Sequence, residues 1–397
     1  MLRRTALLAL LLLAACDQDL TRPTEVATLR TAPGPAFFPL PVNDAVWSMA
    51  YGVSESGWVV GEVDLSDTDW HAARWRVTRG DGAPPVATLE DLGQVNGRAT
   101  FAFGVNHRGV AVGGSVEFSS GLGDGPDEAF VYRDGVMQTL PTLGGPNAFA
   151  RRINNFGWIV GQSDTPEGES HATVWRPRRH GGYDVIDLGT LGGSFSWCNT
   201  IDDFGRVVGL SETATGAVVG WRWDGHGPLR PLPSLTPGGR NYAVDFNLWG
   251  AIVGNGTTAD GNNHAARWYH GRVQDLHGRL PGYINSFATG INLGNDIVIS
   301  ADDPDFAING ILLRGNATIN LGSAAGTAES DAYDISDRGW IAGGAGEGGV
   351  FGAGLWLPRA WDQAITAGVK LTGRAGPAAG TELGAAHQRV LRRARIR

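Results

Sequence analysis

The chain has 397 residues, of which 42% are hydrophobic, 18% are charged and 60 are glycine. This composition supplies enough apolar material for a large packed core. The formal net charge is −8, or −10 if Arg3 and Arg4 are lost with an N-terminal signal. An acidic balance of this size argues against a nucleic-acid partner.

Residues 1–15 have the features of a secretory signal: two arginines, an apolar run too short for a permanent membrane span, and small residues before Cys16. The segment Leu13-Ala14-Ala15-Cys16 resembles the bacterial lipobox, which implies cleavage before Cys16 and lipid attachment to its sulfur. The alternative is an ordinary cleaved signal with a chance cysteine. We expect an exported protein, lipid-anchored to the bacterial cell envelope, periplasmic or surface-exposed, with residues 16–35 as a flexible tether.

A short unit recurs seven times, at residues 51–61, 103–113, 151–161, 199–209, 244–254, 289–300 and 333–343. Each copy has Ser, Asn or Asp three residues before a Gly, or before Asn295 in the sixth copy, which predicts a type I turn closing a β-hairpin. We take the closing small residues as Gly61, Gly113, Gly161, Gly209, Gly254, Ser300 and Gly343. Their mean interval of about 47 residues is typical of a propeller repeat.

Two further strands are predicted in each unit. The third ends on an aromatic or large apolar residue, as in 71–75, 128–132 and 171–175, and a fourth short run precedes a Gly pair, as in 136–145 and 183–193. Four short strands per unit, separated by Gly-rich turns, predict an all-β fold, a seven-bladed β-propeller of four-stranded blades over residues 36–360.

The innermost strand carries a small residue at one register. Six copies have Ala there, and the fourth has Cys198. We therefore interpret Cys198 as a small buried hydrophobe and not as a nucleophile. If Cys16 is lipidated, Cys198 is the one remaining thiol, and an intramolecular disulfide is excluded.

The two ends of the repeat region complement each other. Residues 37–53 align without a gap on 137–153, so residues 36–41 are an extra fourth strand, and the seventh copy ends after its third strand near Trp356. We predict that this N-terminal strand completes the last blade and closes the ring. Residues from 361 could compete for that place. The C-terminal tail, 361–397, is expected to be partly disordered, and its basic end is interpreted as solvated, with nucleic-acid or anionic-lipid binding as the alternative.

The hairpin followed by His-Ala-x-x-Trp and Asp-Leu-Gly-Thr-Leu-Gly-Gly resembles the bacterial HAF-repeat extracellular family over residues 37–358. The tripeptide appears at 71–73, 128–130, 171–173 and 264–266 and is lost in the fourth, sixth and seventh copies. The resemblance implies an exported repeat protein and carries no activity with it.

No phosphate loop, zinc-ligand pair, nucleophile elbow or dinucleotide-binding fingerprint is found, so the catalytic residues are unknown. His71, His171 and His264 share one repeat position in non-adjacent copies, and we expect each to bond locally where its third strand begins.

Acidic residues gather in the loops between second and third strands, and oxygen-rich loops of this kind suit calcium. The candidate ligands are Asp64, Asp67, Asp69, Asp124, Asp127, Asp302, Asp303 and Asp305. Solvated acidic loops are the alternative, and no other cofactor is expected. The turns between third and fourth strands are instead basic, which predicts one acidic and one basic face.

Trp58, Trp158, Trp249 and Trp340 lie in or just after the hairpin turns, on the face opposite the acidic loops. They could stack on a ligand or pack between blades. We expect a monomeric, non-catalytic binding module with a glycan or envelope-protein ligand. The alternatives are a carbohydrate-active enzyme, a glycosidase or polysaccharide lyase, which needs converging carboxylates, and a purely structural envelope component.

Overall fold

The computed structural model describes residues 35–66, 69–78, 83–116, 127–322, 326–347 and 350–358. Cys16, Asp67, Asp124 and the tail beyond 358 lie outside the described residues. The described part is built almost entirely of antiparallel strands, and no helix in it is long and apolar enough to cross a membrane.

Each of the first six sequence repeats forms a four-stranded meander. The first two are β2 (Trp47–Val53), β3 (Trp58–Ser66), β4 (Asp69–Thr78) and β5 (Val86–Gly93), and then β6 (Ala99–Val105), β7 (Ala111–Val116), β8 (Glu128–Arg133) and β9 (Val136–Thr139).

The next two meanders share an eight-stranded sheet. They are β10 (Ala148–Ile153), β11 (Ile159–Asp164), β12 (Ser170–Pro177) and β13 (Tyr183–Asp187), and β14 (Gly192–Ile201), β15 (Val207–Thr213), β16 (Val218–Trp223) and β17 (Arg230–Pro231). One parallel pair, Ser170 with Phe195, joins β12 to β14.

The fifth and sixth meanders are again separate sheets. They comprise β18 (Asn241–Phe246), β19 (Ile252–Thr257), β20 (Asn263–Tyr269) and β21 (Arg272–Asp275), then the short 3-10 helix η1 (His277–Arg279), then β22 (Asn285–Ile291), β23 (Ile297–Asp302), β24 (Ile308–Arg314) and β25 (Ala317–Asn320).

The last sheet combines both ends of the described chain. Its order is β1 (Ala36–Pro39), β28 (Val350–Leu357), β27 (Ile341–Glu347) and β26 (Glu329–Ile335), with Phe37 paired to Trp356 in the antiparallel register of β1 and β28. Residues 36–39 therefore supply the fourth strand of this sheet, as the alignment of Leu40-Pro41 on Leu140-Pro141 predicts.

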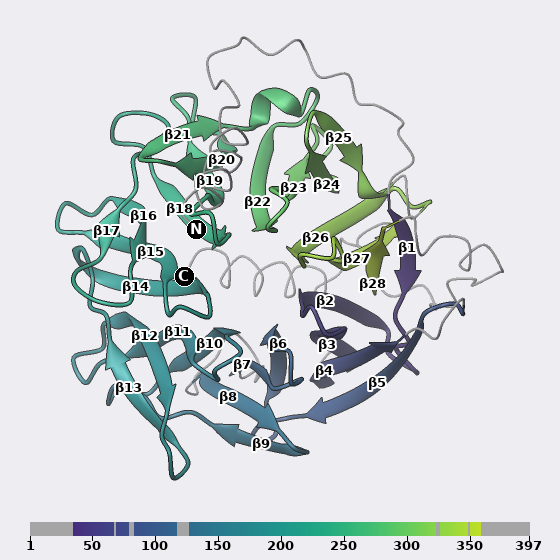
Figure 1. Cartoon of the computed structure of the whole chain (residues 1–397), viewed down its shortest axis with the longest axis horizontal. Helices are drawn as coiled ribbons and strands as arrows, with labels where there is room; N and C mark the ends of the chain where they lie inside the picture. The colour runs from purple at the N-terminus through teal and green to yellow at the C-terminus, as the bar shows by residue number, and fades with distance from the viewer. Residues whose placement is uncertain are drawn as a thin grey trace, which may run out of the picture.

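Figure 1 shows the sheets arranged radially in a ring, with the first strand of each meander nearest the centre. Each of these inner strands contacts the next one along the chain, and β26 contacts β2. A ring of radially placed antiparallel meanders is the β-propeller arrangement.

The hairpin predicted at the start of each repeat is confirmed. In all seven turns the fourth residue donates its N–H to the carbonyl of the first, as Gly157 does to Asn154 at 3.0 Å. The fourth residue has positive φ throughout, including Asn295 at 59°. This conformation explains why only Gly and Asn occur there.

The small closing residue follows from a β-bulge in every inner strand. In the third meander the bulge lies between Ala150 and Arg152, and a Cβ added to the facing Gly161 would lie 1.9 Å from the Phe149 carbonyl oxygen. The sixth repeat corrects our alignment by one residue. Ala288 pairs with Ile299, and Ser300 pairs with Phe287, so Ile299 and not Ser300 occupies the closing position.

The small residues of the inner strands are buried as predicted. Ala50, Ala150 and Cys198 have no exposed surface. Burial raises the pKa of the Cys198 thiol, so this sulfur stays protonated and unreactive.

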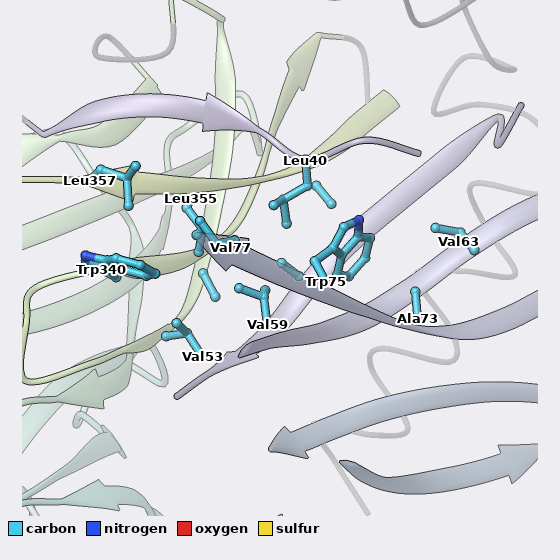
Figure 2. Close-up of a cluster of buried hydrophobic side chains, with 13 residues drawn as sticks. Leu40, Val53, Val59, Val63, Ala73, Trp75, Val77, Trp340, Leu355 and Leu357 are labelled. Atoms are coloured by element: carbon cyan, nitrogen blue, oxygen red, sulfur yellow. The ribbon is translucent and has the colours of Figure 1, made fainter. Parts of the chain in front are cut away.

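Apolar side chains fill the seams between neighbouring sheets. Figure 2 shows the seam between the first and last sheets, where Val59 and Trp75 of the first sheet meet Trp340 and Leu355 of the last. Leu40, which follows β1, lies in the same cluster, and the indole nitrogen of Trp75 donates to the Pro41 carbonyl at 2.7 Å. The N-terminal segment is thereby packed into the core.

Candidate functional site: the hairpin face

The turns of the seven hairpins lie on one face of the ring, which we call the hairpin face, and neighbouring turns are hydrogen-bonded to each other. The Asn154 carboxamide oxygen accepts the N–H groups of Phe156 and Trp158 at 3.0 and 2.9 Å, which is the local cap that the sequence predicts. Its amide nitrogen donates in addition to the Asp202 carbonyl of the next turn at 3.0 Å.

The same inter-turn bond recurs around the ring. Asn106 donates to the Asn154 carbonyl, Asn247 to that of Asn292, and Asn292 to that of Ser336. The repeated Asn therefore has two structural functions, of which sequence reasoning found one. Because each turn is tied to the next, side chains at the turn tips are held in fixed relative positions.

Three consecutive turns carry large exposed aromatic side chains at their third position. Phe156 is 69% exposed, Phe204 is 75% exposed and Trp249 is 63% exposed. We call these three residues the aromatic tips. The equivalent positions of the other four turns hold smaller or polar residues: Ser56, Arg108, Gly294 and Arg338. The aromatic tips thus mark one sector of the hairpin face.

Polar contacts fix the turns that carry the tips. Asn155 donates its N–H and its amide nitrogen to the Asp203 carboxylate, both at 2.8 Å. The Trp249 indole nitrogen donates to the Leu293 carbonyl of the following turn at 3.0 Å.

Arg206 links the second and third of these turns, because its guanidinium donates to the Leu248 carbonyl at 3.5 Å. Its guanidinium forms an ion pair with Asp202 at 2.6 Å and lies 5.7 Å from the Phe204 ring centre. The aromatic surfaces are therefore preorganised, and a polar side chain directly precedes both Phe156 and Phe204.

Three exposed arginines belong to the same three meanders. Arg179 lies in the turn between β12 and β13, Arg222 near the end of β16, and Arg272 at the start of β21. In an antiparallel meander, the turn between the first and second strands and the turn between the third and fourth strands lie at the same end of the sheet. These arginines therefore lie on the hairpin face. The contact of Gly225 with the Gly205 turn, where an added Cβ would lie 3.5 Å from the Gly205 carbonyl oxygen, agrees with this placement.

None of these three arginines forms an ion pair with a described residue, whereas other basic side chains nearby are neutralised. Arg176 and Arg178 pair with Asp184 at 3.7 and 2.7 Å, and Arg230 pairs with Asp224 at 3.2 Å. Unpaired basic charge therefore occurs in the same three repeats, and on the same face, as the aromatic tips.

The four tryptophans singled out from the sequence occupy two kinds of position. Trp249 is an aromatic tip. Trp58 packs on Gly109 and Trp158 on Gly205, the turn glycines of the next meander, while Trp340 is 3% exposed and lies against Gly57. Trp340 therefore presents no ring face to a ligand. Phe156 and Phe204, which sequence reasoning missed, stand where Trp249 stands, and the third turn position was the signal that could have found them.

The predicted calcium ligands are spread over separate sheets. Asp64 is 2% exposed and lies close to Glu62, Asp69 accepts from His71 and Gln94, and the Asp303 carboxylate caps its own turn. Asp127 belongs to the second meander, and Asp302 and Asp305 flank Asp303. Among the described residues, no group of three or more His, Cys, Asp or Glu side chains is arranged to hold a metal ion.

The predicted local bonding of the repeated histidines is confirmed. Nδ1 of His71 lies 2.8 Å from the Asp91 carboxylate, and the same contact joins His171 to Asp187 and His264 to Asp275. Each pair ties the start of a third strand to the fourth strand of the same meander, so its role is structural.

A buried acidic cluster lies where β2 and β3 meet the seventh repeat. The Tyr51 hydroxyl donates to Glu62 at 2.5 Å, and the Tyr51 ring lies edge-on to Tyr333. Burial raises the pKa of Glu62 to about 8, and burial together with the Glu62 charge raises the pKa of Asp64 well above its usual range. Both carboxyls are therefore protonated near neutral pH and are sealed from solvent.

A group of charged side chains connects the third and seventh repeats. Arg152 forms an ion pair with Asp334 at 3.2 Å and donates to the Phe103 carbonyl at 2.7 Å. Asp334 also accepts the Val53 N–H at 2.9 Å. Burial and the Asp334 charge raise the pKa of Asp245 to about 6, although Arg152 opposes this. These bulge residues connect non-adjacent repeats, and their polar atoms are used within the fold.

Comparison with known proteins gives distant structural likenesses. No family model and no curated protein sequence matches the chain. AofleA from Arthrobotrys oligospora is 9% identical with a TM-score of 0.39, over 70% of this chain and 88% of its own. The fungal lectin of Aleuria aurantia, described as a six-bladed β-propeller with fucose recognition, is 11% identical with a TM-score of 0.38, over 70% and 96%.

A chain of the mitotic checkpoint complex is 14% identical with a TM-score of 0.47, over 85% of this chain and 97% of its own. All three TM-scores are below 0.5. We therefore draw the propeller arrangement from the strand topology of this chain and infer nothing about its function from these likenesses.

Proposed function

We propose that this protein is a non-catalytic binding module with a glycan or protein ligand, exported and lipid-anchored through Cys16 at the bacterial cell envelope. The observation that carries the binding role is the row of three aromatic tips on neighbouring turns. Exposed aromatic side chains gathered in one sector of a rigid surface are characteristic of interaction sites. The export and the anchor rest on the sequence of residues 1–16 and its lipobox resemblance.

We further propose seven blades in a ring closed by β1. The eight-stranded sheet consists of two complete meanders joined by one residue pair, which supports counting it as two blades. The pairing of β1 with β28 and the contact of β26 with β2 support closure. A ring of this kind is the rigid scaffold that the binding surface requires.

Binding is favoured over catalysis by the state of the acidic cluster. A glycosidase needs a pair of carboxyl groups within reach of substrate, and a lyase needs a base with a charge-neutralising partner. Glu62 and Asp64 have the raised pKa of an acid catalyst, but they are 0% and 2% exposed. The exposed aromatic tips offer a surface that a ligand can reach.

The test compares ligand capture by the protein and by the F156S/F204S/W249S variant on a glycan array and against envelope proteins. We expect the variant to lose at least tenfold in affinity for any ligand that the protein binds. The matched control is Phe306→Ser, because Phe306 is 78% exposed and lies in the β23–β24 turn on the opposite face. Equal binding by all three proteins would refute the assignment of the hairpin face.

A further inference from the structure

We infer that the hairpin face of the third to fifth repeats binds an acidic polysaccharide, with the aromatic tips stacking on sugar rings and Arg179, Arg222 and Arg272 neutralising its carboxylates. This inference rests on the proposed binding function and names the class of ligand. It draws on two independent observations, the periodic placement of the aromatic tips and the unpaired arginine charge on the same face of the same three repeats.

The periodicity points to a polymer. Phe156, Phe204 and Trp249 occupy the same turn position in three consecutive repeats, and hydrogen bonds between successive turns fix their order along the ring. Equivalent side chains on successive repeats present equivalent contacts at regular intervals. A ligand built of repeating units can satisfy all of them at once, and the gain from linked contacts is large.

The charge points to an anionic polymer. Near its connection between the third and fourth strands, each of the three repeats supplies an exposed arginine without an ion pair, whereas the neighbouring Arg178 and Arg230 are already paired with acids. A guanidinium forms bidentate hydrogen bonds with a carboxylate. The acids close to the tips, Asp202 and Asp203, are engaged by Arg206 and Asn155.

The polar groups beside the rings favour a sugar over a bilayer. The carboxylate of Asp203 is exposed and directly precedes Phe204, and the amide of Asn155 directly precedes Phe156. Inserting these tips into a membrane would bury a carboxylate and an amide, which is costly. A sugar offers C–H groups to the ring and hydroxyls to the polar neighbours, so both kinds of group are satisfied in water.

The experiment measures binding of the purified protein to polygalacturonate and to its fully methyl-esterified form, which has the same backbone without the charge. We expect at least tenfold tighter binding to the acid, and a steep loss of that preference as salt is raised. The R179Q/R222Q/R272Q variant should lose at least tenfold in affinity for the acid and little for the ester. The F156S/F204S/W249S variant should lose both.

Two controls match these variants. Arg240→Gln removes an exposed arginine that directly precedes β18, at the end of that strand opposite its hairpin turn, and Phe306→Ser removes an exposed aromatic from the same opposite face. Both should bind as the unaltered protein does. All substituted side chains are exposed, so unchanged thermal melting verifies that each variant is folded.

The outcomes separate this inference from the proposed function. The acidic ligand is overturned if the protein binds acid and ester equally, or if the arginine variant keeps its preference for the acid. In either case, binding that is lost in the F156S/F204S/W249S variant still supports the proposed binding surface. Tighter binding to oligo(dT) than to polygalacturonate overturns the polysaccharide and assigns the surface to nucleic acid. Affinity for the acid that survives loss of the tips overturns the whole assignment.

Discussion

Glu62 shows how burial of a single side chain changes the chemistry that its sequence position suggests. It follows the closing Gly61 in β3, the strand that leads into a loop rich in acidic residues. Its side chain is nevertheless fully buried against Tyr51. Water is excluded from this place, so the neutral form of the carboxyl is favoured and the pKa rises to about 8. The residue therefore acts as a hydrogen-bonding acceptor within the core.

This shift predicts a definite dependence of stability on pH. The folded protein keeps the Glu62 proton up to about pH 8, whereas the unfolded chain releases it near the ordinary value of 4.5. The stabilisation is complete below the lower value and is lost as the pH rises through the upper one. Glu62→Gln mimics the protonated acid, so the variant should melt close to the unaltered protein at pH 5 and above it at pH 8.5.

Glu90→Gln provides the contrast in the same melting series. Burial alone would raise the pKa of Glu90, but hydrogen bonds from Tyr132 and Arg74 lower it. This carboxylate stabilises the fold when charged, so its replacement should lower the melting temperature at pH 7 and matter less as the acid is protonated. Parallel curves for E62Q and the unaltered protein would contradict the buried-acid interpretation.

The hairpin with its bulge is the element that the repeats share most fully. The turn needs positive φ at its fourth residue, and the bulge brings a carbonyl oxygen against the facing Cα. Glycine suits both positions for different reasons: the turn position requires positive φ, and the closing position leaves no space for a side chain. The sixth repeat has Asn295 and Ile299 in these places, which shows that one element can be built without either glycine.

Gly161→Ala tests the steric demand. Its Cβ would lie 1.9 Å from the Phe149 carbonyl oxygen, a backbone atom that cannot move away freely. We expect a loss of about 1–3 kcal/mol in the free energy of unfolding, measured by denaturant titration. Gly278→Ala is the control, because nothing lies within 4 Å of its added Cβ. Equal stability of both variants would show that the bulge relaxes without cost.

The contact between the first and last sheets concerns the whole molecule. The first and last sheets meet along an apolar seam, and the segment that follows β1 contributes Leu40 to it at 4% exposure. The Asp334–Val53 hydrogen bond and the Asp334–Arg152 ion pair add polar links among the first, third and seventh repeats. The first and seventh repeats are thus joined by a hydrogen bond between residues 281 positions apart in the sequence, Val53 and Asp334.

A chain that begins at residue 45 should accordingly be less stable. It lacks β1, exposes the edge of β28 and removes the Pro41 carbonyl that accepts from Trp75. The point variant Leu40→Ala keeps the strand and should cost about 2–5 kcal/mol. Thermal melting of both is the measurement. Unchanged melting of the truncated chain would mean that the ring does not depend on its N-terminal strand.

The local elements could be predicted from the amino-acid sequence alone. The period, the hairpin turns with Asn295 at positive φ, the extra strand at 36–39, the burial of Cys198 and the local bonding of the histidines all follow from short-range backbone and packing rules. These rules act among residues of one repeat, so they can be applied directly to the amino-acid sequence.

Which side chains face solvent and which face a neighbouring repeat could not be predicted, because this depends on how the sheets pack together. Trp340 and Trp249 looked equivalent, yet one packs on Gly57 and the other is exposed. Asp64 looked like a loop ligand, yet it is buried in the core. The reason is that exposure depends on residues some 50 or 280 positions away, whose contact is made when the sheets assemble side by side in the ring.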